Sequence, residues 1–277
     1  MRIGVMKEIS IKNLADLLDR IRKDTASWTK VGFARPWFRG QSNKSKPPLP
    51  SIFREGNDTH EFHLSTNFRL VAPGFGDTPE TGRIDQWLFL MQHVGLPTRL
   101  LDWTESPLAA AFFATEKAAT REIENDAAIW AIDPIELNKL SGISDFPNTW
   151  KRSSVRQTIQ IAWGTQDEPT FLLSSKKVLY KPCEFPIALY PSSVHPRISK
   201  QKSCFTLHGT DKRDFEILLN KQKITIDSKF LKYVLPTNII EDVWIELNQL
   251  GITYSTIFPD LDGLAKELKV KFGIKLS

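Results

Sequence analysis

The chain has 277 residues, of which 41% are hydrophobic and 25% are charged. This length suits one large domain or two small ones, and the balance of residue types is that of a globular protein rather than a disordered one. The 37 basic and 32 acidic residues leave a net charge of +5, which permits a polyanionic partner such as nucleic acid but also serves solubility.

Membrane and secretory classes are not expected from this sequence. No stretch is apolar over the length that a membrane span needs, and the charges within residues 1–23 are incompatible with the core of a signal peptide. The two cysteines, Cys183 and Cys204, are too few for a disulfide scaffold or a cysteine-rich zinc site. We therefore expect a reducing cytoplasm, no membrane partner and no metal.

In the first half of the chain, the pattern of apolar residues, glycines and prolines predicts helices separated by short strands and loops. An amphipathic helix is expected at about 10–23 with Ser10 as its cap, and a short aromatic strand ends at Gly40. Glycines and prolines make residues 56–82 mostly loop, with a short helix at about 60–70. The elements expected next are a helix at about 84–93, a buried strand at 100–103 and a helix from 106 to about 118.

The second half contains a long segment without a clear pattern. Residues 141–182 are predicted as a less certain basic and aromatic insertion. Strands and helices are interspersed without the regular spacing of a doubly wound sheet, so we expect a single mixed α+β domain over 1–277, with helices around an antiparallel or split sheet. The elements predicted here are strands at 127–132, 187–190 and 223–226 and helices at 238–250 and 260–271.

One histidine-rich segment fails as a metal motif. His60-Glu61-Phe62-His63 has a single residue between the glutamate and the second histidine. The helical zinc motif needs two residues there, so that both imidazoles share one face of the helix. A surface helix is the better interpretation.

Two other segments are more polar than their apolar surroundings. The first, Trp37-Phe38-Arg39-Gly40-Gln41, places an arginine inside a strand-like aromatic run. Burying a guanidinium is costly unless it meets an anion or several carbonyl groups, and the adjacent glycine allows a ligand to approach the backbone closely. Arg39 therefore either makes a structural ion pair or holds a phosphate or a ribose.

The second polar segment runs from Gln92 to Thr104 and alternates polar groups with Leu, Pro and Trp. Buried polar groups need partners, so this density predicts a hydrogen-bonded network. The network either fixes the fold, with Arg99 and Asp102 as an internal ion pair, or forms the wall of a ligand pocket. Its members are Gln92, His93, Thr98, Arg99, Asp102 and Thr104.

Two further segments are basic. Residues 195–206, taken alone, predict a basic strand or loop at a solvated edge. Residues 150–181 mix lysines and arginines with aromatic residues, a combination that suits single-stranded nucleic acid because bases stack on the rings while cations meet phosphates. A solvated loop with a few core aromatics fits the same pattern.

These segments together resemble the FRG domain family, which is named for its Phe-Arg-Gly motif. Phe38-Arg39-Gly40-Gln41 matches that motif, and Leu49-Pro50-Ser51-Ile52-Phe53-Arg54 is similar to the stretch that follows it. The run from Gln92 to Thr104, continued through Phe113-Ala114, resembles the most specific stretch of the family. Two later runs, 196–206 and 257–264, resemble its third motif and its usual ending.

The resemblance implies a relation to the ADP-ribosyltransferase superfamily, and with it an NAD-dependent enzyme built on a split antiparallel sheet. In one branch of that superfamily an arginine followed by glycine contacts NAD, a serine or threonine motif precedes an alanine-rich helix, and a late glutamate completes the site. Arg39-Gly40 is similar to the first element and Asp102-Trp103-Thr104 to the second. The late position carries Gln201, and Glu184 and Glu216 are the other acidic candidates.

Roles follow from the resemblance. It implies a bacterial toxin or antiphage effector that modifies nucleic acid, RNA rather than DNA, or protein, and that is restrained by an antitoxin or regulatory protein. Two alternatives stay open: a non-catalytic module that binds a nucleotide or a partner, and a glycohydrolase that cleaves NAD without transfer. The implied NAD contacts are Arg39, Gly40, Gln41, Thr98, Arg99 and Thr104, and the implied catalytic residues are Asp102, His93 and Gln201.

Overall fold

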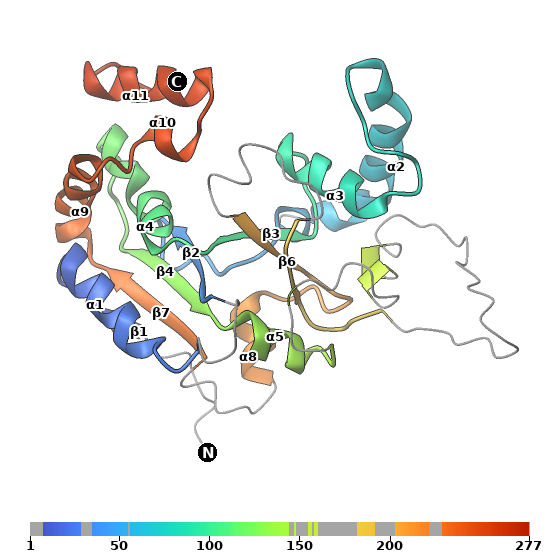
Figure 1. The fold of residues 1–277 in the computed structure, drawn as a ribbon, viewed down its shortest axis with the longest axis horizontal. Coiled ribbons are helices and arrows are strands. Elements are labelled where there is room, and N and C mark those ends of the chain that lie inside the picture. The colour runs from blue at the N-terminus through green and yellow to red at the C-terminus, as the bar shows by residue number, and fades with distance from the viewer. Residues whose placement is uncertain are drawn as a thin grey trace, which may run out of the picture.

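A seven-stranded mixed sheet forms the centre of the computed structural model, which describes residues 8–28, 35–54, 56–143, 147, 155–156, 158–159, 182–191, 203–221 and 229–276 (Figure 1). The strand order is β1-β7-β4-β2-β3-β6-β5, and β1 and β7 are the parallel pair in an otherwise antiparallel sheet. The expected α+β class is thereby confirmed. The strands are β1 (Glu8–Ser10), β2 (Trp37–Gln41), β3 (Leu100–Thr104), β4 (Ala127–Ile132), β5 (Ile187–Leu189), β6 (Ser203–Leu207) and β7 (Phe230–Leu235).

The sheet consists of two halves that meet between β2 and β3. Strand β2 pairs with β4 over all of its five residues, and β3 pairs with β6 over all of its five. Between β2 and β3, in contrast, the register contains the single pair of Phe38 with Thr104. The two strands therefore separate beyond this pair, and we call this place the β2–β3 junction.

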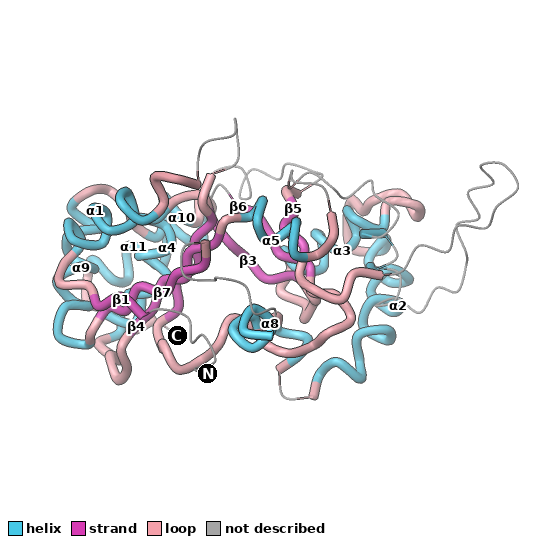
Figure 2. The backbone as a smooth tube through the Cα atoms, turned by 90° about the horizontal axis from the view of Figure 1, so that it is seen from below, coloured by secondary structure: helices cyan, strands magenta, loops and turns pink. Residues whose placement is uncertain are grey.

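One face of the first half is covered by helices that the apolar pattern predicts. Helix α4 is rich in alanine and lies flat on β2, and its Phe112 is fully buried beside Trp244 of α9. Figure 2 shows these helices at one end of the molecule and α2 and α3 at the other. The elements on the first half are α1 (Leu14–Asp24), α4 (Pro107–Thr115), α9 (Thr237–Gln249) and α10 (Tyr254–Ile257), with α11 (Leu261–Lys271) packed on α10.

The same face of the second half is covered by α3 (Ile84–His93), which packs Trp87 and Met91 against Leu100 and Phe205. Because side chains alternate along a strand, Trp37 and Leu101 point to the opposite face, where they pack with residues of two short helices. Those helices are α5 (Pro134–Leu140) and α8 (Phe215–Lys221). The remaining elements are helix α2 (Glu61–Val71) and the short 3₁₀ turns η1 (Ser51–Phe53), η2 (Asn57–His60), η3 (Ala72–Gly74) and η4 (Glu116–Thr120).

Two sequence-based predictions were wrong: the residue that caps the first helix and the location of residues 203–207. Ser10 belongs to β1, and the first helix starts at Leu14 because the side chain of Asn13 accepts a hydrogen bond from the Asp16 amide at 2.8 Å. Residues 203–207 are not a solvated edge: they form β6, inside the sheet, with Cys204 fully buried.

Other predictions lie outside the described residues. These are the strand at 223–226 and most of the insertion at 141–182. No helix in the described part of the chain is both long enough and apolar enough to cross a membrane.

Candidate functional site

Arg39 occupies the β2–β3 junction. Its Nη1 donates to the carbonyl oxygen of Asp102 at 2.8 Å, so the guanidinium bridges the two halves of the sheet where their backbones separate. Its Nε is buried and has no hydrogen-bond partner among the described residues. Burial lowers the pKa of Arg39, Asp102 acts in the opposite direction, and the charge of Arg54 lowers it further. The guanidinium therefore retains hydrogen-bonding capacity that the described protein does not use.

Asp102 lies beside Arg39 on β3 and is the exposed residue of an otherwise buried strand. The protein around it displaces enough water to raise the pKa of its carboxyl group, while Arg39, a hydrogen bond from Gln92 and the charge of Arg54 lower it. The carboxylate Oδ2 accepts that bond from Gln92 Nε2 at 2.8 Å. An accessible carboxyl group with a shifted pKa beside a fixed cation is a candidate for proton transfer or for stabilising positive charge.

The segment around η1 closes the site from a third side. The amide of Thr98 donates to Ser51 Oγ at 3.4 Å, and the amide of Ile52 donates to the Thr98 carbonyl at 3.3 Å. Arg54 directs Nε and Nη2 to the carbonyl oxygen of Leu49, at 3.0 and 2.7 Å. Its positive charge is therefore held near Arg39 by a backbone group and not by a carboxylate.

Arg99 has a different role from the one expected. Its carboxylate partner is Glu61 of α2, at 2.7 Å from Nε and 2.6 Å from Nη2, and not the expected Asp102. Nη1 donates to the carbonyl oxygens of His208 and Gly209, both at 3.1 Å. Every guanidinium nitrogen is thus engaged within the protein, and the pair fastens α2 to the end of β6.

Gly40 packs against the middle of α4, and Thr104 contacts the residue that precedes this helix. A Cβ at Gly40 would lie 1.8 Å from the Ala110 carbonyl oxygen, so the close approach that this glycine permits is made by the helix. Thr104 is buried, and its Oγ1 accepts a hydrogen bond from the Ser106 amide at 3.1 Å, just before the helix begins. Both residues position α4 against the junction.

The other implied site residues are less closely tied to Asp102. Gln41 donates to the Lys46 carbonyl at 3.1 Å, and its Oε1 is buried without a partner among the described residues. His93 ends α3 directly after Gln92 and is partly exposed. Gln201 lies outside the described residues.

Glu216, a candidate for the late acid, is engaged elsewhere. Its Oε1 accepts from Trp130 Nε1 at 2.9 Å and lies 3.2 Å from Lys232 Nζ, which also contacts Glu8 at 3.0 Å. Glu184, the other candidate, contributes to the raised pKa of Arg213, whose main cause is the hydrogen bond with Asp211.

Sequence reasoning missed two members of the site. Glu61 was assigned to a surface helix, and Arg54 was noted only as part of a family motif. Glu61 has no local signal, because its partner Arg99 lies 38 residues away, and the proximity of Arg54 to Arg39 on β2 arises only in the fold. The apolar neighbours of Arg54 in Ser51-Ile52-Phe53-Arg54 were the available clue.

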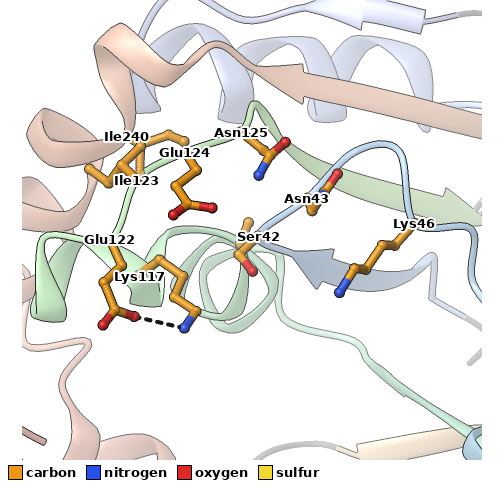
Figure 3. Close-up of a pocket in the computed structure, with 10 residues that line it drawn as sticks. Ser42, Asn43, Lys46, Lys117, Glu122, Ile123, Glu124, Asn125 and Ile240 are labelled. Atoms are coloured by element: carbon orange, nitrogen blue, oxygen red, sulfur yellow. Dashed lines mark hydrogen bonds and ion pairs between the residues drawn. The ribbon is translucent and has the colours of Figure 1, made fainter.

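A pocket of about 260 Å³ opens just beyond the carboxyl end of β2 (Figure 3). Lys117 and Glu122, which form an ion pair of 3.1 Å, contribute to its wall, as do Ser42 and Glu124. None of the implied site residues lines this pocket. In the described residues, no group of three or more His, Cys, Asp or Glu side chains is placed to hold a metal ion.

Comparison with known families places the junction inside a recognised domain. Residues 34–122 match the FRG domain. This segment is therefore similar to the FRG domain. The matched segment runs from before β2 to just after η4, so it contains Arg39, Arg54, Gln92, Thr98 and Asp102. The later runs at 196–206 and 257–264 lie outside the match, and no curated protein and no solved structure matches the chain.

Proposed function

We propose that the FRG domain binds NAD at the β2–β3 junction and transfers its ADP-ribosyl group to an acceptor. The observation that carries this proposal is Arg39, whose guanidinium lies at the junction with an unpartnered Nε, contacts the main-chain carbonyl oxygen of Asp102 and is influenced by the charge of the Asp102 carboxylate. A cation and an accessible carboxylate are the two charges that the reaction needs. The match to the FRG domain supports the assignment of both to one functional unit.

Arg39 would bind the diphosphate of NAD, because a planar guanidinium donates two parallel hydrogen bonds to phosphate oxygens. Arg54 adds a second positive charge near it, anchored on the Leu49 carbonyl. Gln41 Oε1, buried without a described partner, would accept from a ribose hydroxyl. Together these groups would hold the dinucleotide in a fixed orientation, which contributes to catalysis by removing rotational freedom.

In the reaction, the bond between the nicotinamide nitrogen and ribose C1′ breaks, and its electron pair leaves with nicotinamide. A nucleophile of the acceptor forms a new bond to C1′, and the proton of that nucleophile passes to a base. The Asp102 carboxylate would stabilise the positive charge that develops on the ribose and would then accept the proton. His93, which follows Gln92 at the end of α3, is the second candidate base.

For the acceptor we favour nucleic acid, and RNA over DNA. The support is in the sequence, where Trp150, Trp163 and Phe171 alternate with basic residues such as Lys176. A transferase of this kind would act as a toxin or antiphage effector and would be restrained by a regulatory protein. Growth arrest on expression that is relieved by Arg39→Ala would support that role.

A single assay tests the proposal. The purified chain is incubated with NAD labelled in its adenylate part, together with RNA, single-stranded DNA or cell protein in separate reactions. We expect transfer of label to one of these acceptors, and none with the Arg39→Ala variant at equal folded fraction by circular dichroism. Retention of full activity by that variant would contradict the assignment of Arg39.

Two observations favour other outcomes of the same assay. Glu216 is engaged by Trp130 and Lys232, which fits a module that binds a nucleotide without turning it over. Such a module would bind NAD and leave it intact. The exposure of Asp102 to solvent fits a glycohydrolase, which would release free ADP-ribose and label no acceptor.

A further inference from the structure

A chain of hydrogen bonds leads from the backbone of β3 to the carboxylate of Asp102. The Leu100 amide donates to Thr98 Oγ1 at 3.0 Å, Thr98 Oγ1 donates to Gln92 Oε1 at 2.5 Å, and Gln92 Nε2 donates to Asp102 Oδ2 at 2.8 Å. The carboxylate at one end sets the direction of the bonds. Because it only accepts, it takes the NH₂ end of the Gln92 amide, and the amide oxygen then faces Thr98, whose hydroxyl accepts from the Leu100 amide and gives its one hydrogen to that oxygen.

The chain fixes which end of the Gln92 amide faces Asp102. A glutamine amide turned by 180° has nearly the same shape, so its hydrogen-bond partners alone decide its orientation. Thr98 is 1% exposed, so no solvent competes for its hydroxyl, and the hydroxyl holds the amide oxygen. The NH₂ group of Gln92 is thereby turned towards the carboxylate.

Asp102 is also held through its main chain, where its carbonyl oxygen accepts from Arg39 Nη1 at 2.8 Å. The same residue is therefore fixed at its backbone by β2 and at its side chain by α3, yet it stays exposed. An exposed carboxylate, even on an otherwise buried strand, would ordinarily rotate freely, so this double restraint needs an explanation other than packing.

We propose that Gln92 and Thr98 are positioning residues, which hold the Asp102 carboxylate in one orientation at the β2–β3 junction and stabilise its ionised form. Thr98 thus acts through Gln92 and makes no contact with a ligand of its own. The inference depends on the proposed function only for the use to which Asp102 is put, because the restraint itself acts in the protein without NAD.

Other charged and titratable groups also act on Asp102 and enter the test. Burial of its surroundings raises the pKa of Asp102, and Arg39 on β2 and Arg54 after η1 lower it in part. On the neighbouring strand β6, burial raises the pKa of the Cys204 thiol, and the charges of Glu105 and Asp102 raise it further. Substitutions at positions 92 and 98 leave these groups unchanged. A change in the pKa of Asp102 in those variants therefore reports the loss of the hydrogen-bond chain.

The test is a titration of Asp102 followed by NMR in protein with ¹³C-labelled aspartate side chains, the signal being assigned with Asp102→Asn. We expect Thr98→Val to raise the pKa of Asp102 by about 0.5–1 unit and Gln92→Leu to raise it by about 1 unit or more, because a hydrogen bond to the charged form is lost. Thr98→Ser, which keeps the hydroxyl, restores the value of the unsubstituted protein.

A titration of Thr98→Val that matches the unsubstituted protein would overturn the proposal, and so would a Thr98→Ser variant that shifts as far as Thr98→Val. Should Thr98→Val fail to fold, Gln92→Leu decides the question alone, since Gln92 is only partly buried. The proposed function fails separately: a chain that neither binds nor turns over NAD removes that function and leaves the titration result intact.

Discussion

At the scale of single residues, Gly40 of the Phe-Arg-Gly motif determines how closely α4 approaches β2. Its position allows no side chain, since a Cβ would lie 1.8 Å from the Ala110 carbonyl oxygen and 2.8 Å from the Ala114 amide nitrogen. We expect Gly40→Ala to lower the free energy of unfolding by about 1–3 kcal/mol, because backbone must move to relieve the overlap. Chemical denaturation measures this. Gly82→Ala is the matched control, since its Cβ would meet nothing within 4 Å.

A stability close to that of the unsubstituted chain for Gly40→Ala would mean that α4 shifts freely on the sheet. The sequence predicted that a ligand approaches this glycine closely, and this was wrong, because helix α4 occupies that space. What the sequence did not indicate is that the glycine and the arginine beside it serve different faces of the sheet: Gly40 meets α4, whereas Arg39 reaches across the junction to Asp102.

The buried histidine at the end of β6 predicts a dependence of stability on pH. His208 is fully buried, neither ring nitrogen has a partner among the described residues, and burial lowers its pKa to about 3, with the charge of Arg99 acting in the same direction. Between pH 3 and the ordinary histidine value of about 6.5, the unfolded chain therefore binds a proton that the folded chain does not. The contribution to stability is complete above about pH 6.5 and declines as the pH falls towards 3.

Denaturation at a series of pH values checks this expectation. His208→Gln should flatten the dependence of stability on pH between pH 3 and 6.5. Equal slopes for this variant and the unsubstituted protein would contradict the lowered pKa of His208.

At the scale of elements, the pair of Glu61 and Arg99 fastens α2 to the rest of the molecule. Both side chains are almost buried, at 12% and 3% exposure. Glu61→Ala leaves the Arg99 charge without its carboxylate, so we expect a loss of about 3–5 kcal/mol in the free energy of unfolding. The control is Asp19→Ala, which breaks an exposed pair with Arg22 on α1 and should change stability far less, because solvent screens that pair. A small effect at Glu61 would show that water reaches the pair.

The helices were predictable at this scale and several strands were not, for a physical reason. Helices α3, α9 and α11 carry an apolar periodicity and end signals within their own sequence, such as Gly251 after α9, which adopts a φ of +79°. Strand β7 lacks a clear apolar pattern in the sequence, because Lys232 interrupts its apolar run. That lysine is buried between Glu8 and Glu216 and lies 5.2 Å above the Trp130 ring, partners that local pattern cannot supply.

The candidate site was predicted only in part, because some of its contacts join residues that are distant in the chain. Polar density between residues 92 and 104 indicated a network, and the structure confirms that Gln92, Thr98 and Asp102 form one. The pairing of Arg99 with Glu61 could not be read from the sequence, because an arginine in a polar run has several acids within reach and only the fold chooses among them.

At the scale of the whole molecule, the sheet is two halves joined at the β2–β3 junction. Strand order depends on contacts between residues far apart in the chain, so composition and periodicity predicted the α+β class but could not predict which strands meet. The fold sets Arg39 of one half against Asp102 of the other. The charges that the proposed reaction needs therefore come together only when both halves are assembled.

The central claim is that the junction binds NAD through Arg39, and calorimetric titration of the chain with NAD tests it most directly. The unsubstituted chain should bind NAD, and Arg39→Gln should bind it at least about 10-fold more weakly, the loss expected for a charge-assisted pair of hydrogen bonds. Thermal unfolding shows that both proteins are folded at the temperature of titration, and Arg22→Gln on the distant helix α1 controls for the loss of a positive charge. Equal affinity of Arg39→Gln and the unsubstituted chain, or no binding by either, would contradict the account.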